Sequence, residues 1–163
     1  ASPLSPEIGG VRKATAALVP RGGTALVDAL YASLSVAEAD PGRAVIIVFS
    51  DGLDTASWLS SEQVIEAAKR VDAVVYAVNA RTGRRDRLLS ELADTTGGRV
   101  FDVASPERLA TTFTSILEEF RQRHIVSYVP SGVHTAGWHK VELRVKGRRA
   151  TVKMRAGYLQ GPD

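Results

Sequence analysis

The chain has 163 residues, enough for one folded domain with a hydrophobic core, or for one domain with an appendage. Its hydrophobic content of 44% and charged content of 24% are typical of a globular protein, and no apolar run reaches the roughly 18 to 20 residues of a membrane-spanning helix. The absence of cysteine excludes disulfides and thiolate chemistry, while the net charge of +3 comes from residues 121–163, which hold nine Lys/Arg against two Asp/Glu.

The N-terminal part of the sequence predicts two helices. Ser5-Pro6 is typical of an N-cap followed by a first helical position, and predicts a helix that runs to Leu18. A turn at Gly22-Gly23-Thr24 separates it from a second helix over about residues 25–38, in which leucines recur at every fourth position. The apolar stripe of this second helix is expected to lie on a sheet.

Three runs predict strands. Val45–Phe49 is continuously apolar, which predicts a central strand covered on both faces. Residues 73–78 predict a second buried strand, and residues 99–103 a short third one. Helices are predicted between and after these strands, so the pattern indicates a parallel α/β sheet.

Capping signals mark the remaining helices. Ser60 and Gln63 form a capping-box pattern at the start of one helix. A leucine-rich helix around residues 88–92 is predicted to end at Gly97-Gly98, and Ser105-Pro106 predicts the N-cap and first position of a long helix that runs to about Arg123.

The C-terminal segment changes to a period of two. Val141, Leu143 and Val145 alternate with charged residues, and the run Ala150–Met154 alternates in the same way after a turn. An antiparallel hairpin with one solvated face is predicted, so that residues 1–123 form an α/β domain and residues 124–163 a β extension. Because the basic side chains of the extension alternate with apolar ones and no aromatic pattern interleaves them, a solvated strand face is favoured over nucleic-acid binding.

The chemistry-bearing residues cluster after the first strand. Ser50-Asp51-Gly52 follows Val45–Phe49 directly, Asp54-Thr55 comes next, and Gly22-Gly23-Thr24 lies upstream. Ligands of open α/β sheets bind outside the carboxyl ends of the strands. A carboxylate at this place is therefore a candidate for binding.

These motifs resemble a known family. Gly-Gly-Thr-Ala-Leu at 22–26 and Phe-Ser-Asp-Gly-Leu-Asp-Thr at 49–55 are similar to the second and third parts of the metal-ion-dependent adhesion site of von Willebrand factor A-like domains. The segments 128–130, 139–145 and 155–158 resemble those that follow the last helix in the bacterial branch of that family. The resemblance implies the C-terminal half of a doubly wound, mainly parallel sheet flanked by helices, with a C-terminal antiparallel hairpin, and it favours a location outside the cytoplasm.

The resemblance also implies a metal site. Thr24 would offer a hydroxyl and Asp51 a carboxylate, directly or through water, to Mg²⁺ or to Mn²⁺ or Ca²⁺. An acidic group of a protein partner would then complete the coordination. The first motif of the family, Asp-x-Ser-x-Ser, occurs nowhere in residues 1–163, so the resemblance implies an incomplete or remnant site. In the alternative interpretation Thr24 caps a helix and Asp51 fixes a turn.

The missing first motif has a consequence for the sheet. In the family the strand corresponding to Val45–Phe49 has a neighbour along each edge. We therefore expect the edge without a partner to pair with an N-terminal segment outside this sequence, with a second copy of the chain, or with the chain's own rearranged tail.

Three interpretations of function follow. The first is a metal-assisted protein-binding module, with Asp54, Thr55 and Trp58 as further partner-contacting candidates. The second is a metal-free structural or interaction domain of the same fold. The third, an enzyme such as a hydrolase, is not favoured: Ser50 sits in half of a nucleophile-elbow pattern, in which Val48 replaces the glycine that the turn needs.

Overall fold

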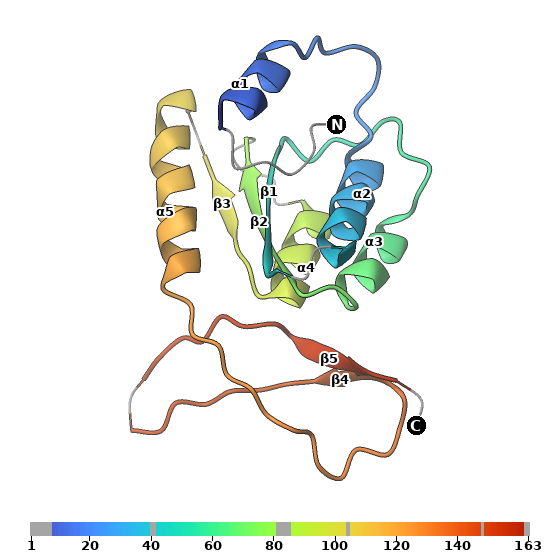
Figure 1. Ribbon diagram of the computed structural model, residues 1–163, viewed down its shortest axis with the longest axis vertical. Coiled ribbons are helices and arrows are strands. Elements are labelled where there is room, and N and C mark those ends of the chain that lie inside the picture. The colour runs from blue at the N-terminus through green and yellow to red at the C-terminus, as the bar shows by residue number, and fades with distance from the viewer. Residues whose placement is uncertain (1–7, 40–41, 81–85, 104, 148, 162–163) are drawn as a thin grey trace.

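The computed structural model describes residues 8–39, 42–80, 86–103, 105–147 and 149–161. Within them a three-stranded parallel sheet is flanked by helices, and a two-stranded antiparallel ribbon lies near the C-terminus (Figure 1). The predicted fold class, a parallel α/β sheet with a C-terminal antiparallel hairpin, is confirmed.

The sheet consists of β1 (Ala44–Ser50), β2 (Ala73–Asn79) and β3 (Val100–Asp102), in the order β1-β2-β3. The expectation that Val45–Phe49 is a central strand is wrong for the described sheet, because β2 has a neighbour on each side and β1 has one. All seven residues of β2 are buried, whereas β1 is half-buried and Phe49 is 51% exposed. Burial thus follows the number of neighbouring strands.

Helices cover both faces of the sheet. One face carries α2 (Leu26–Ala39), α3 (Ser61–Ala68) and α4 (Arg87–Thr96), and the other carries α5 (Leu109–Arg121) (Figure 1). Successive strand residues point to opposite faces, so β2 divides its side chains between two cores. The core beneath α2, α3 and α4 contains Ala73, Val75 and Ala77, and that beneath α5 contains Val74, Tyr76 and Val78.

The helix ends agree with most of the capping signals. The Ser60 hydroxyl accepts from the Gln63 amide at 3.4 Å, the Gln63 side chain accepts from the Ser60 amide at 2.8 Å, and Gly97 ends α4 at φ 79°. The long helix, however, begins as α5 at Leu109 after a 3₁₀ turn (Pro106–Arg108), three residues later than predicted. Such turns are frequent at helix starts, and the N-cap Arg108 provides no side-chain cap.

The first helix, α1 (Ile8–Ala16), ends two residues earlier than predicted and joins neither core. Its described side chains, from Gly9 onward, are all exposed. The N-cap prediction for Ser5-Pro6 lies outside the described residues.

The paired strands of the C-terminal ribbon lie further from its turn than those of the predicted hairpin. Strands β4 (Gly137–Lys140) and β5 (Gly157–Gln160) are antiparallel, and the pairing extends inward only to the bond from the Val141 amide to the Ala156 carbonyl, at 3.0 Å. A Cβ at Gly157 would lie 2.8 Å from the Trp138 ring, so the ribbon closes where glycine allows this approach. The runs predicted as strands, 141–145 and 150–154, lie in the open loop beyond.

Arg155 attaches the C-terminal segment to the α/β body. Its guanidinium donates to the carbonyl oxygens of Ala68, Lys69 and Val71, at and just beyond the end of α3. Burial lowers the pKa of Arg155, an effect that the Asp72 carboxylate partly opposes. The cation therefore satisfies carbonyls that the end of a helix leaves without intrahelical partners.

Candidate functional site

The carboxyl ends of the three strands bring polar residues together. The register places Ser50 beside Asn79 and Asn79 beside Asp102. The Asn79 amide group donates to the Asp102 carboxylate at 2.9 Å, and Asn79 is only 2% exposed. This end of the sheet is therefore an ordered polar edge, from which the 51–59 loop leaves β1.

The 51–59 loop is bonded to the segment that precedes α2. The Thr24 amide donates to the Thr55 hydroxyl at 2.8 Å, while the Thr24 carbonyl accepts from the amides of Thr55, at 2.8 Å, and Ala56, at 3.1 Å. Gly23 lies so close that a Cβ would come within 2.9 Å of both Thr55 and Ala56. The two motifs chosen from the sequence thus meet in the structure, through Thr24 and Thr55.

Asp54 joins the loop to the first turn of α2. Its carboxylate accepts from the Val27 amide at 2.8 Å, from the Ser57 amide at 3.1 Å and from the Ser57 hydroxyl. A carboxylate at a helix N-terminus satisfies an amide that lacks an intrahelical partner. Asp54, predicted as a partner-contacting residue, therefore also has a structural role.

Asp28, in the first turn of α2, bonds in the opposite direction: its side chain reaches from the helix to the backbone of the loop. Its carboxylate accepts from the amides of Trp58, at 3.1 Å, and Leu59, at 3.0 Å. The Asp28 amide in turn donates to the Ser57 hydroxyl at 3.1 Å. Two carboxylates on opposite sides of the contact therefore hold residues 54–59 in one conformation.

These bonds change the acidity of Asp54. Hydrogen bonding from the Ser57 side chain, and then from the Val27 amide, lowers the pKa of Asp54 from 3.8 to about 2. Because the pKa is lower in the folded chain, the contribution of this carboxylate to stability is fully present above about pH 4 and is lost as the pH falls toward 2.

Removal of the Ser57 hydroxyl should raise the pKa of Asp54. In the Ser57→Ala variant the largest cause of the lowered value is gone, while the Val27 amide remains. An NMR titration of the Asp54 carboxyl carbon measures the change. Ser35→Ala is the control, because the Ser35 hydroxyl bonds only to the Tyr31 carbonyl within α2. If both variants kept the Asp54 pKa near 2, Ser57 would not be its hydrogen-bond partner.

Trp58 stands out from the loop. Its side chain is 95% exposed, although its amide is fixed by Asp28. Phe49 and Leu53, on either side of the Ser50-Asp51-Gly52 motif, are 51% and 41% exposed. A large aromatic side chain on a fixed backbone loses little conformational freedom on binding, and tryptophan is enriched among the residues that dominate interface energies.

The two metal-ligand candidates, Thr24 and Asp51, supply one hydroxyl and one carboxylate. Asp51 accepts from the Leu53 amide at 3.1 Å in a local turn, and Gly52 follows at φ 77°, close to the Asp86 side chain. Within the described part of the chain, no group of three or more His, Asp or Glu side chains is placed to hold a metal ion.

Sequence reasoning missed two of the residues that shape this site. In the sequence, Asp28 looks like any other polar residue of its helix. Nothing in the neighbouring residues indicates that its carboxylate bonds to the amide of Trp58, 30 positions away. Asp86 caps α4 through the Leu89 amide at 2.9 Å and lies against Gly52. An aspartate before the Arg87-Leu88-Leu89 run is an N-cap signal that could have identified it.

The fold and the site define an α/β domain with a fixed, aromatic-bearing loop at the carboxyl end of its sheet. No protein-family model matches the sequence, and no curated protein matches it. Among solved structures, the chain is similar to one described as an uncharacterized membrane spanning protein from Vibrio fischeri, with 25% identity, a TM-score of 0.41, and coverage of 72% of this chain and 69% of that one. In the present chain, no helix among the described residues is long and apolar enough to cross a bilayer.

Proposed function

We propose that this chain is a protein-binding module of the von Willebrand factor A-like type, whose contact surface is the 51–59 loop with Trp58 as its anchor. The observation that carries the proposal is an almost fully exposed tryptophan on a backbone that Asp28 and Asp54 hold in place. Asp51 and Thr55 are exposed polar residues of the same loop. This arrangement of an aromatic anchor among polar neighbours is typical of interface hot spots.

In this proposal the module binds a metal ion only when further ligands complete the site formed by Thr24 and Asp51. Thr24 and Asp51 would supply one hydroxyl and one carboxylate, and the remaining ligands of Mg²⁺ or Mn²⁺ would come from outside residues 1–163. If no such ligands exist, the loop binds its partner without metal. This metal-free interaction domain is the second candidate function, favoured by the donors that Asp28, Asp54 and Asp51 already hold.

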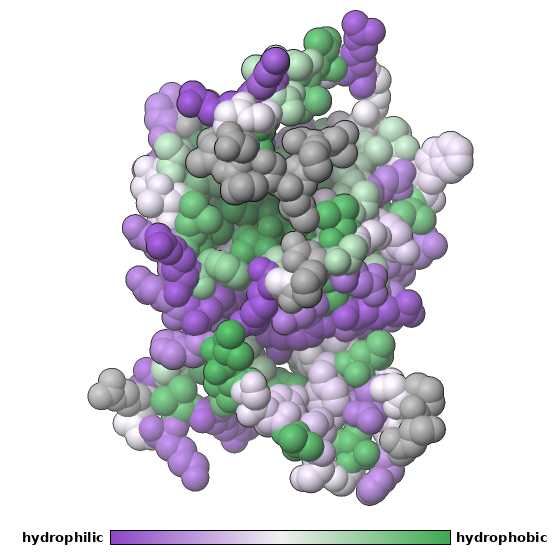
Figure 2. Space-filling view, in the orientation of Figure 1, coloured by the Kyte–Doolittle hydropathy of each residue, from purple (hydrophilic) through white to green (hydrophobic). Residues whose placement is uncertain are grey.

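The open edge of β1 belongs to the same proposal. Among the described strands β1 pairs only with β2, and in Figure 2 the surface over the strands, between α5 and α2, is hydrophobic and recessed. An unpaired apolar strand edge recruits another strand. We propose that an N-terminal segment outside this sequence, or a second copy of the chain, pairs there.

Selection from a phage-displayed peptide library tests the binding loop. Peptides selected against the unaltered chain should bind the Trp58→Ala variant at least about tenfold more weakly, because truncation of an interface anchor costs about 2 kcal/mol or more. Tyr31→Ala is the control, since Tyr31 is an exposed aromatic residue on α2, outside the 51–59 loop. Repeating the measurement with Mg²⁺ and with a chelator separates the metal-assisted from the metal-free form.

Two results would contradict the proposal. One is a set of selected peptides whose affinity is the same for Trp58→Ala and the unaltered chain. The other is an equal loss in the Tyr31→Ala variant, which would place the contact surface on α2.

A further inference from the structure

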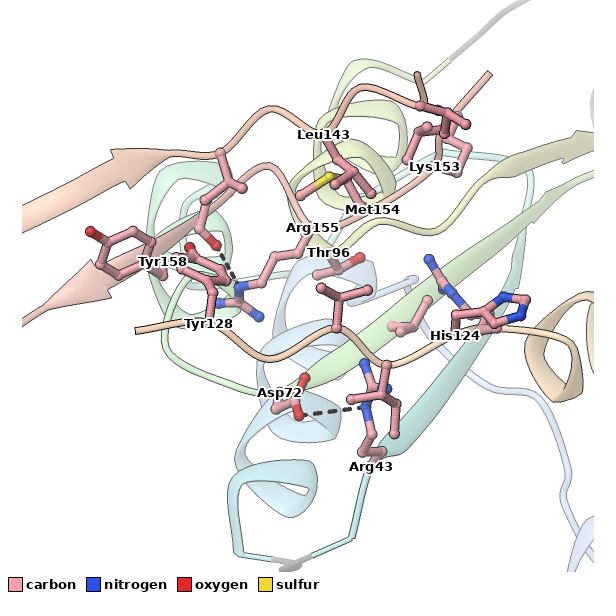
Figure 3. Close-up of a pocket in the computed structure, with 18 of the residues that line it drawn as sticks. Arg43, Asp72, Thr96, His124, Tyr128, Leu143, Lys153, Met154, Arg155 and Tyr158 are labelled. Carbon is pink, nitrogen blue, oxygen red and sulfur yellow. Dashed lines mark hydrogen bonds and ion pairs between the residues drawn. The ribbon is translucent and has the colours of Figure 1, made fainter. Parts of the chain in front are cut away.

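A second candidate surface lies at the opposite end of the sheet. A cavity of about 660 Å³ opens between the C-terminal segment and the residues that precede β1 and β2, and its size is within the ordinary range for ligand sites, about 300 to 1,000 Å³. In Figure 3 Leu143 and Met154 lie on one side of it, and Arg43 and Asp72 on the other. The cavity is therefore distinct from the 51–59 loop.

Aliphatic side chains from three runs of the C-terminal segment form a large part of the lining. Val141, Leu143 and Val145 contribute from one extended run and residues 150–155 from another, with Ile125 and Val126 from a third. Several of these apolar side chains are unusually exposed: Ile125 is 72% exposed, Val126 67% and Leu143 45%. Figure 2 shows such hydrophobic residues spread over the lower part of the molecule, beneath a hydrophilic belt.

The cations around the cavity are already committed. Arg43 pairs with Asp72 at 3.5 Å, Lys153 pairs with Asp94 at 3.0 Å, and Arg155 donates to carbonyls at the end of α3. Arg123 donates to the Gly97 carbonyl. A small anion would therefore find no free guanidinium or ammonium among these four, and the interior favours an apolar occupant.

Much of the backbone around the cavity lies outside helices and strands. No backbone-to-backbone hydrogen bond links the runs 124–136, 142–145 and 149–154 to a described residue, while residues 146–147 form a turn. The inward pairing of the ribbon stops at Val141 and Ala156. These runs are rich in β-branched residues, which are enriched in β-strands. Their backbone N–H and C=O groups, next to an apolar cavity, could therefore pair with an added strand.

The outer face adds a charge preference. Lys140, Lys146 and Arg149 are exposed, do not line the cavity and make no ion pair with any described residue. Arg144 pairs with Glu142, the acidic residue of this run. A strand lying along the run would thus meet aliphatic side chains inward and uncompensated positive charge outward.

We infer that this cavity binds an extended peptide strand of a partner protein in which aliphatic and acidic residues alternate. The strand completes the unpaired backbone of the C-terminal segment by β-augmentation, and its aliphatic side chains fill the cavity. Its acidic side chains face Lys140, Lys146 and Arg149. Binding here is independent of the 51–59 loop.

The test uses two synthetic peptides and fluorescence anisotropy. A labelled peptide of alternating valine and glutamate should bind the chain at least about tenfold more tightly than one of alternating valine and lysine. Leu143→Glu should weaken that binding by about tenfold or more, whereas Leu159→Glu should leave it nearly unchanged. The two leucines are both 45% exposed, but only Leu143 lines the cavity. Val145→Ser repeats the test with a milder change if Leu143→Glu unfolds the chain.

Amide hydrogen exchange decides what fills the site in the free chain. Residues 142–147 and 149–154 should exchange rapidly alone and become protected when the valine–glutamate peptide is bound. Protection in the free, monomeric chain would overturn the inference, because the segment would then close on itself. Protection that grows with protein concentration would also overturn the inference, because a second copy of the chain would then occupy the site. In the binding measurement, equal affinity for the two peptides would contradict the inferred preference for acidic residues. Retained peptide binding in Trp58→Ala is expected, since the two surfaces are separate.

Discussion

Replacement of Gly98 by alanine is expected to lower the free energy of unfolding by about 3 kcal/mol or more. A Cβ at this position would overlap the carbonyl oxygen of Val75 and lie 2.7 Å from its carbonyl carbon. Val75 belongs to β2, the fully buried middle strand, so the backbone that would have to move is the most constrained in the sheet. Urea unfolding followed by circular dichroism measures the loss.

Gly10→Ala is the control for the Gly98 substitution. Gly10 lies in α1, where a Cβ would meet no atom within 4 Å, and alanine is favoured over glycine in a helix by about 0.5 to 1 kcal/mol. No loss of stability is expected there. If Gly98→Ala were as stable as Gly10→Ala, the segment entering β3 would not pack against β2 as described.

Replacement of Arg155 by methionine should have the second largest effect, a loss of about 3 kcal/mol in the free energy of unfolding. Its guanidinium bonds to the carbonyls of Ala68, Lys69 and Val71, and a hydrogen bond to a charged group contributes about 1.5 to 3 kcal/mol. Lysine should restore less than half of the loss, because one ammonium group cannot reproduce the planar fork of donors.

Arg144→Met provides the comparison for Arg155. The Arg144 side chain is 82% exposed and pairs with Glu142 at 2.7 Å, a surface arrangement that contributes at most about 1 kcal/mol. Urea denaturation of both variants, with amide exchange over residues 137–160, separates a global loss from release of the C-terminal segment. Equal stability of the two variants would show that Arg155 does not attach this segment to α3.

The strands show what apolar pattern can and cannot predict. Val45–Phe49 and residues 73–78 are similar apolar runs, and both form strands. Their order in the sheet depends on which strands pair along each edge, and an apolar run carries no information about its neighbours. For that reason the sequence favours β1 as the central strand, whereas the structure has β2 in that position.

The C-terminal segment shows the same limit for register. The alternation at Val141, Leu143 and Val145 predicts a strand, which these residues do not form, although all three side chains line one cavity. The pairing itself occurs further out, where Gly157 approaches Trp138 closely. Such a contact depends on residues 19 positions apart and has no local signal.

The candidate site could be predicted in part. The motifs at Thr24 and Asp51 point to the carboxyl end of the sheet, where strand-to-helix turns collect and where the 51–59 loop leaves β1. The bonds that organise the loop come instead from Asp28 and Asp54, which reach across about 30 residues of sequence. Side chains that act at such separation are recognised only once the chain is folded.

The most direct test of the proposed binding loop is fluorine NMR of the chain labelled with 5-fluorotryptophan. The sequence holds two tryptophans, so two resonances are expected, and the one missing in Trp58→Phe belongs to Trp58. On addition of a library-selected peptide, the Trp58 resonance should shift as its exposed ring becomes covered, while that of Trp138 stays in place. A saturating peptide that leaves the Trp58 resonance unchanged would contradict the account.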